Sequence, residues 1–237
     1  MNPSRIVLAA LSIAAFACAC ATPRLPKESV MRLLDEYSAA SQPSLACFGS
    51  VKIKGNGVNF NGSVILAIDG DQYRLEVVDG AGITAVAVAG GSGVMIRLDM
   101  NTGAKTILTG EAAKTVHLDK VSAPVSLLKT LVTGAPPPSE KKGEIQPAGT
   151  VYKMATSNPS MELELDGERL TQLTLYGEDG NQITAKLGPM TGVGLERHVA
   201  SARVEAGGGA VMEINWQKVT PKEKFPEGFF SFTEVDE

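Results

Sequence analysis

The sequence has few aromatic residues, few histidines and no excess of basic charge. Aromatic residues make up 5% of its 237 positions, and there are two histidines and three cysteines. With 22 Lys and Arg against 26 Asp and Glu, the net charge is −4, which argues against nucleic-acid binding because that function needs a basic surface. The scarcity of histidine and cysteine leaves little material for metal or nucleophile chemistry. We therefore expect no cofactor, no metal and no nucleic-acid partner, and we expect that the protein is not an enzyme.

Aliphatic residues are abundant instead. Hydrophobic residues reach 43% and charged residues only 20%, a composition that excludes wholesale disorder. A chain of this length buries roughly 70% of its unfolded surface, so it needs no disulfide bonds to fold. Its core must therefore be built mainly from aliphatic side chains.

The N-terminus has the three-part plan of a secretory signal peptide. Residues 1–5 are short and positively charged, residues 6–16 form an apolar run, and residues 17–21 are small. The run is too short for a transmembrane helix, which needs about 20 apolar residues. We expect a signal peptide at residues 1–19, a tether at 20–27 and a single domain at 28–237.

Small residues before a cysteine resemble the lipobox of bacterial lipoproteins, in which that cysteine is acylated after cleavage. Two frames fit, ending at Cys18 or Cys20, and we favour Cys20 because bulky Phe16 suits the peptidase poorly in the other frame. A plain signal peptide with incidental cysteines is the alternative. By the same resemblance, Ala21 after the cysteine implies sorting to the outer membrane, with the protein lipid-anchored on the periplasmic face. Cys47 is then left without a disulfide partner and is expected to be a buried small hydrophobe.

Two segments have the apolar periodicity of helices. In residues 28–40 the apolar positions recur at helical spacing, and residues 122–133 run from a Ser122 cap to a stop at Gly134. A shorter helix is expected at residues 111–118.

The rest of the chain alternates with a period of two. The segments 161–166 and 183–187 show this most cleanly, and turn residues separate such runs. We count about eleven strands at short spacing, which predicts one antiparallel sheet with an apolar face and a solvent-exposed polar face. A sheet of this size must curl, and the two longer helices are the apolar stripes available to cover its concave side.

The order of these elements resembles that of the LolA/LolB family. The likeness is strongest over residues 71–138, which contain the segment 71–82, the strand 83–89, the strand pair 94–99 and 104–108, and the helix that follows Pro124. This resemblance implies a mainly β fold with helices, namely an unclosed antiparallel β-barrel with an α-helical lid over an apolar cavity. Family members take the acyl chains of lipoproteins into that cavity. The LolB-like members are acylated receptors that accept lipoproteins from a LolA-like carrier and release them into the outer membrane.

Candidate site residues follow from the alternation and from this resemblance. Arg74 is a candidate to hold the lid helix by hydrogen bonds to its carbonyl end, which resembles a role in the carrier; a surface arginine is the alternative. Gly80, Ala81 and Gly82 match the family's delivery loop, in which a large apolar residue touches the membrane, but Ala81 stands in that place here. The cavity-lining candidates are Val64, Leu66, Leu75, Val77, Ile96, Leu98, Leu128, Leu131 and Trp216.

The expected partners are acyl chains of lipoproteins, a LolA-like carrier and the outer membrane, and we expect a monomer. One alternative is a structural or interaction lipoprotein whose sheet is packed solid and whose exposed strand edge docks a partner. Another is a lipid-binding relative without delivery activity. An enzyme built around His117 or His198 is the weakest hypothesis.

Overall fold

The structure is a computed structural model of the whole chain. It describes residues 26, 28–30, 32, 44–55, 57–91, 93–100, 102–118, 121–137, 145–148, 151–154, 160–166, 169–177 and 181–231. The predicted signal peptide and both candidate lipobox cysteines lie outside these residues. Of the helix expected at 28–40, Glu28–Val30 and Arg32 are described and are helical, and Val30 is fully buried in the core. No helix in the described part is long and apolar enough to cross a membrane.

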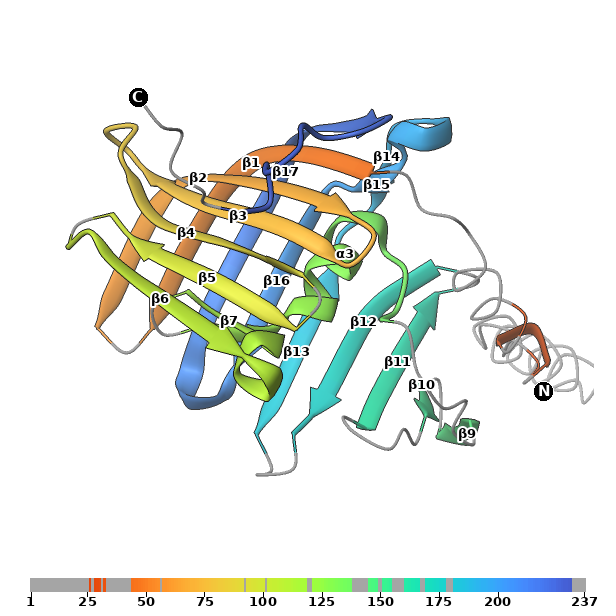
Figure 1. The fold of residues 1–237 in the computed structure, drawn as a ribbon. Helices are drawn as coiled ribbons and strands as arrows, with labels where there is room; N and C mark the ends of the chain where they lie inside the picture. The colour runs from red at the N-terminus through yellow and green to blue at the C-terminus, as the bar shows by residue number, and fades with distance from the viewer. Residues whose placement is uncertain are drawn as a thin grey trace, which may run out of the picture.

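Antiparallel strands dominate the described chain (Figure 1). The strands are β1 (Ser44–Gly55), β2 (Val58–Asp69), β3 (Gln72–Asp79), β4 (Thr84–Gly91), β5 (Val94–Asp99), β6 (Ala104–Thr109), β7 (Thr115–Leu118), β8 (Val121–Pro124), β9 (Ile145–Ala148), β10 (Val151–Met154), β11 (Ser160–Asp166), β12 (Arg169–Tyr176), β13 (Gln182–Leu187), β14 (Met190–Thr191), β15 (His198–Val199), β16 (Ser201–Ala206) and β17 (Ala210–Lys222). The helical elements are η1 (Gly110–Lys114), α3 (Val125–Thr133), η2 (Gly194–Glu196) and η3 (Gly207–Gly209).

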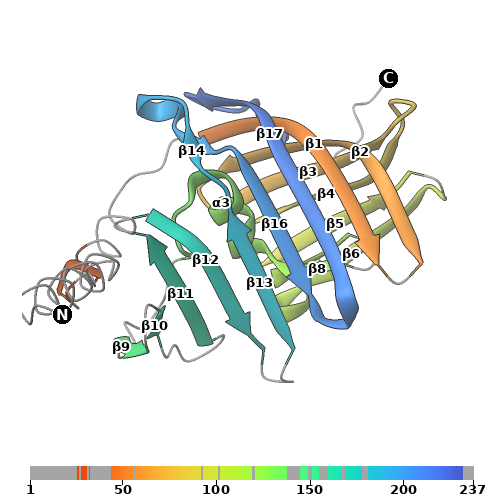
Figure 2. The same cartoon turned by 180° about the vertical axis from the view of Figure 1, so that it is seen from behind.

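Thirteen of these strands form one sheet, in the order β6-β5-β4-β3-β2-β1-β17-β16-β13-β12-β11-β10-β9. Within the described residues the end strands β6 and β9 do not pair with each other, so the sheet curls without closing, as Figures 1 and 2 show. The prediction of an unclosed antiparallel sheet is confirmed. The described chain divides into more and shorter strands than the eleven expected, because the C-terminal half adds short pairs such as β9–β10 and β14–β15.

The helix α3 lies inside the curve of the sheet (Figures 1 and 2). It ends as predicted at Gly134, whose φ of 70° is the left-handed conformation that glycine adopts at helix C-termini. Its start differs from the prediction, because Ser122 belongs to β8 and pairs with His117. The first helical residue follows Pro124, since a proline disfavours helical conformation in the residue before it.

The short helix expected at residues 111–118 is only partly present. Gly110–Lys114 forms the 3-10 helix η1, but Thr115–Leu118 is the strand β7. Val116 in this strand is buried and belongs to the core. Tertiary pairing with β8 therefore decides the conformation of the second half of this segment.

Candidate functional site

The concave face of the sheet carries the candidate site, and its centre is lined by aliphatic side chains. The predicted positions Val64, Leu66, Leu75 and Val77 are each at most 4% exposed. Pairing places Val64 opposite Val77 and Leu66 opposite Leu75, and directly opposite residues of antiparallel strands point to the same face. These four side chains therefore form one apolar surface across β2 and β3.

The helix α3 lies beside β15 and β16, and its buried residues belong to the same apolar core as these four side chains. Its residues Leu128 and Leu131, both predicted to line the cavity, are 3% and 0% exposed. The register places Trp216 on the same face as Val64, because both pair with Gly49 of β1. The indole Nε1 of Trp216 donates a hydrogen bond of 2.8 Å to the carbonyl oxygen of Leu131. The last carbonyls of a helix have no partner within the helix, so this bond fastens α3 to the sheet at its C-terminal half.

Two predicted lining residues lie on the other face. Ile96 pairs with Ala89, and Leu98 pairs with Ala87, so both side chains point to the convex side and are half-buried there. The β4–β5 hairpin fixes this register, and a shift of one residue exchanges the two faces of a strand. The assignment of Ile96 and Leu98 to the cavity is therefore wrong.

The same register turns polar groups of β5 toward the concave face. Arg97 lies opposite Val88, which is fully buried and itself opposite Leu75. The Nε of Arg97 and the hydroxyl of Tyr73 are buried without a hydrogen-bond partner. Burial raises the pKa of Tyr73 to about 12, so this hydroxyl stays protonated and available as a donor. Arg97 was not predicted from the sequence. In β5, Val94, Ile96 and Leu98 alternate with Met95 and Arg97, so the sequence is compatible with either set facing inward.

Arg74 does not contact α3. It lies on the convex face, between Ala67 and Ala89 in the register. Its Nε pairs with Glu76 Oε1 at 2.7 Å, its Nη1 donates to the carbonyl oxygen of Phe229 at 3.1 Å, and its guanidinium lies 5.1 Å from the centre of the Phe229 ring. The predicted role of Arg74 in holding the lid helix is therefore wrong: Arg74 holds the C-terminal segment, and Trp216 makes the bond to α3.

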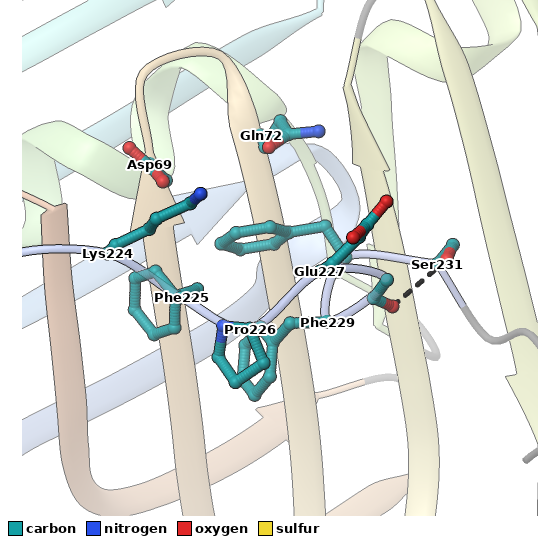
Figure 3. A pocket seen from close by; sticks show the side chains of 10 residues that line it. Asp69, Gln72, Lys224, Phe225, Pro226, Glu227, Phe229 and Ser231 are labelled. Carbon is teal, nitrogen blue, oxygen red and sulfur yellow. Dashed lines mark hydrogen bonds between the residues drawn. The ribbon is translucent and has the colours of Figure 1, made fainter.

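The C-terminal segment crosses the convex face as an aromatic cluster. The rings of Phe225, Phe229 and Phe230 lie 4.9–5.1 Å from one another between centroids. Together with the β2–β3 turn they border a pocket of about 540 Å³ that also receives Asp69 and Lys224 (Figure 3). This pocket is on the face opposite α3, so it is separate from the predicted lipid site.

The segment Gly80–Gly82 forms the exposed turn between β3 and β4. The Asp79 carboxylate accepts hydrogen bonds from the backbone N–H groups of Ala81 and Ile83, at 2.8 and 2.9 Å, which fixes the turn. Ile83 is 59% exposed and is the large apolar side chain of this turn. The alternation predicts Ile83 in the following strand, but that strand, β4, begins at Thr84.

The remaining titratable candidates are not gathered into one site. Cys47 is buried on the concave face without a disulfide, and burial raises its thiol pKa to about 12. His198 lies in β15, with its Nδ1 2.6 Å from the carbonyl oxygen of Glu196, whereas His117 lies in β7. The described residues contain no group of three His, Cys, Asp or Glu side chains placed to hold a metal ion. The described side chains of the concave face therefore provide an apolar environment and no cluster of reactive groups.

Comparison with known proteins finds similar structures but no similar sequences. No protein-family model and no curated protein sequence matches the chain. Among solved structures, the chain is similar to a LolA superfamily protein from Nitrosomonas europaea (11% identity, TM-score 0.52, 87% of this chain and 98% of that one). It is also similar to a DUF1329 family protein from Desulfovibrio piger (11% identity, TM-score 0.56, 87% and 98%).

A third similar structure comes from Vibrio parahaemolyticus and is assigned as an outer membrane lipoprotein-sorting protein domain. It is 9% identical, has a TM-score of 0.52, and the alignment covers 85% of this chain and 94% of that one. At such low identity the similarity concerns the fold alone. The chain therefore has the fold that is shared by the LolA superfamily and by lipoprotein-sorting domains.

Proposed function

We propose that this protein is a lipid-anchored periplasmic protein that binds the acyl chains of lipoproteins between its curled sheet and α3. In this proposal it is LolB-like: it accepts its cargo from a LolA-like carrier and releases it into the outer membrane. The observation that carries the proposal is the aliphatic concave face: Val64, Leu66, Leu75 and Val77 belong to the same apolar core as the residues of the separate helix α3. The similarity to a lipoprotein-sorting domain supports it.

The physical chemistry of the site suits this ligand. Each methylene removed from water contributes about 0.8 kcal/mol, so a sixteen-carbon chain gains on the order of 10 kcal/mol without covalent chemistry or a cofactor. Making room for the chain requires α3 to move away from the sheet. The Trp216–Leu131 hydrogen bond is one local contact that such a movement must break, and its net contribution is only about 1 kcal/mol.

Binding is tested with the mature chain carrying Cys20→Ala, produced without residues 1–19. We expect it to co-purify with lipid or to bind a fluorescent fatty acyl probe that unlabelled palmitate displaces. The variant Leu128→Gln places an amide on the buried side of α3 and should weaken probe binding, whereas Ser126→Gln on the exposed side should not. A delipidated wild-type chain that binds no probe would contradict the proposal.

The edge strand β6 favours a second candidate function. It pairs only with β5 in the described sheet, and Ile107 in it is 62% exposed. Such an edge can accept a strand from another protein, as an interaction lipoprotein without delivery activity would require. Failure of probe binding, together with capture of a partner that is lost in a Thr106→Pro variant, would favour this alternative.

A further inference from the structure

The two most exposed large apolar side chains of the described chain lie at the tip of one loop. Val193 is 82% exposed and Leu195 is 69% exposed, and both belong to the connection between β14 and β15. Large apolar side chains that are clustered and this exposed commonly mark an interaction site in a soluble domain. Neither residue is part of the candidate lipid site on the concave face.

The loop is built to hold these side chains outward. The N–H of Glu196 donates to the carbonyl of Val193 at 3.1 Å, and the N–H of Arg197 donates to the carbonyl of Gly194 at 3.2 Å, which forms η2. At Gly192, where φ is 76°, a Cβ atom would collide with the carbonyl oxygen of Glu196. The tip is therefore a closed turn that presents its two apolar side chains at little further cost in conformational entropy.

The base of the loop is attached to the end of α3. The strands β14 and β15 pair Met190 with Val199. A Cβ atom on Gly134, the residue that ends α3, would lie 3.2 Å from Val199 Cγ2 and 3.3 Å from Met190 Sδ. The exposed tip and the proposed lid thus share one packed junction.

The tip also lies at the end of the molecule where the sheet begins. Ser44, the first residue of β1, pairs with Lys222 at the end of β17, and the β14–β15 loop lies beside this end in both views (Figures 1 and 2). The turn containing Ile83 is at the opposite end, because β1 and β2 are antiparallel and Gly62 of β2 pairs with Asp79. Any anchor at Cys20 is therefore joined through residues 20–43 to the end that carries Val193 and Leu195.

We propose that residues 190–199, the β14–β15 hairpin, are a membrane-docking element whose Val193 and Leu195 insert into the interfacial region of a phospholipid bilayer. The proposal rests on the lipid anchor of the proposed function, because a single lipid attachment and a second weak contact together fix orientation. The neighbouring charges of Glu196 and Arg197 are both exposed and cancel. Docking should therefore depend on apolar contact and little on anionic lipid. It turns the hairpin and the adjoining end of α3 toward the membrane, and the Gly80–Gly82 turn away from it.

Depth-dependent quenching tests this orientation in the mature acylated protein, reconstituted in phosphatidylcholine vesicles with brominated acyl chains. The native Trp216 is 7% exposed and provides the background signal. We expect Leu195→Trp to add fluorescence that the brominated lipid quenches. Two matched controls are Ile83→Trp at the opposite end and Ile107→Trp on the edge strand, which are 59% and 62% exposed in the wild type and should not be quenched. Quenching at Ile83→Trp but not at Leu195→Trp, or equal quenching at all three, overturns the proposal.

A second measurement does not depend on the anchor. The unacylated chain should partition into phosphatidylcholine vesicles at least about tenfold less when it carries Val193→Ser and Leu195→Ser, because two apolar side chains no longer leave water. The pair Ile83→Ser and Ile107→Ser is the control and should partition like the wild type. Equal partitioning of the two double variants overturns the docking hairpin, even if mass spectrometry finds acylated Cys20. Absence of acylation, with the tenfold difference retained, refutes only the anchor of the proposed function.

Discussion

At the scale of single residues, Trp216 makes the contact that matters most for the proposed lid. Its indole satisfies a carbonyl near the end of α3 that the helix cannot satisfy itself. Both partners are buried, since Trp216 is 7% and Leu131 is 0% exposed. The bond therefore contributes to fixing α3, and its loss leaves a buried carbonyl oxygen without a partner.

We predict that Trp216→Phe lowers the free energy of unfolding by about 1–3 kcal/mol, since a buried acceptor left unpaired costs that much. Amide hydrogen exchange in α3 should also become faster relative to exchange in β1 and β2. Ile214→Val on the same face of β17 is the control, because it removes buried volume without removing a hydrogen bond. If both variants accelerate exchange in α3 equally, the hydrogen bond does not hold the helix.

Cys47 gives a prediction with a defined pH range. Burial raises its pKa from 9.0 to about 12, and the thiolate is the reactive form of cysteine. The folded chain keeps this proton up to a pH of about 12, whereas the unfolded chain loses it near 9. The contribution of Cys47 to stability is thus fully present below pH 9 and is lost as the pH rises from about 9 to about 12.

In the mature chain with Cys20→Ala, we expect Cys47 to react very slowly with a thiol reagent at pH 8 and to react at the normal rate after unfolding in urea. Its stability should also fall more steeply between pH 9 and 11 than that of the same chain with Cys47→Ala. Fast labelling of the folded chain at pH 8 would show that Cys47 is accessible.

At the scale of elements, the strands β4 and β5 show where alternation is insufficient. The apolar residues Val94, Ile96 and Leu98 predict a strand correctly, but they do not predict which face points inward. The hairpin pairs Gly91 with Val94, and that pairing carries Met95 and Arg97 to the concave face. Strand existence is a local property, whereas the register is set by the turn and by the neighbouring strand.

The end of α3, unlike the register of β5, is predictable because its signal is local. Gly134 before a proline-rich stretch marks a helix C-terminus locally, and the structure uses its left-handed conformation. The same glycine also packs against β14 and β15, which the sequence does not reveal. Its substitution should therefore cost more than backbone strain alone.

We predict that Gly134→Ala destabilises the protein by about 2–4 kcal/mol, which combines the strain of a left-handed alanine with overpacking against Val199 and Met190. Gly110→Ala is the matched control: its φ is 61°, but no atom lies within 4 Å of the added Cβ. Gly110→Ala should lower the free energy of unfolding by only about 1–2 kcal/mol. Equal losses in urea denaturation would mean that the junction tolerates the methyl group.

At the scale of the whole molecule, the two faces of the curled sheet have different coverings. The concave face carries α3, and the convex face carries the C-terminal aromatic segment held by Arg74. The proposed acyl site and the pocket beside Phe229 are therefore on opposite sides of one sheet. The proposed docking hairpin projects from the end of the molecule at which Ser44 begins the sheet.

Anchoring is a prediction for the whole chain in its cell. We expect the wild type and Cys18→Ala to remain in the membrane fraction after a high-salt wash, because the proposed acyl chains on Cys20 would retain the protein there. Cys20→Ala should be released, since the two apolar side chains of the docking hairpin are too few to retain it alone. Retention of Cys20→Ala with release of Cys18→Ala would assign the anchor to the other frame.

The sequence by itself determined that the chain is a curled antiparallel sheet with a helix over its concave side. Period-two alternation and the glycine that ends α3 are local signals, and they act before any long-range contact forms. Only the tertiary structure decided that Arg97 faces inward, that Arg74 holds the C-terminal segment and that Trp216 holds α3. Those roles depend on strand register and on contacts between residues such as Trp216 and Leu131, 85 positions apart, which no local pattern encodes.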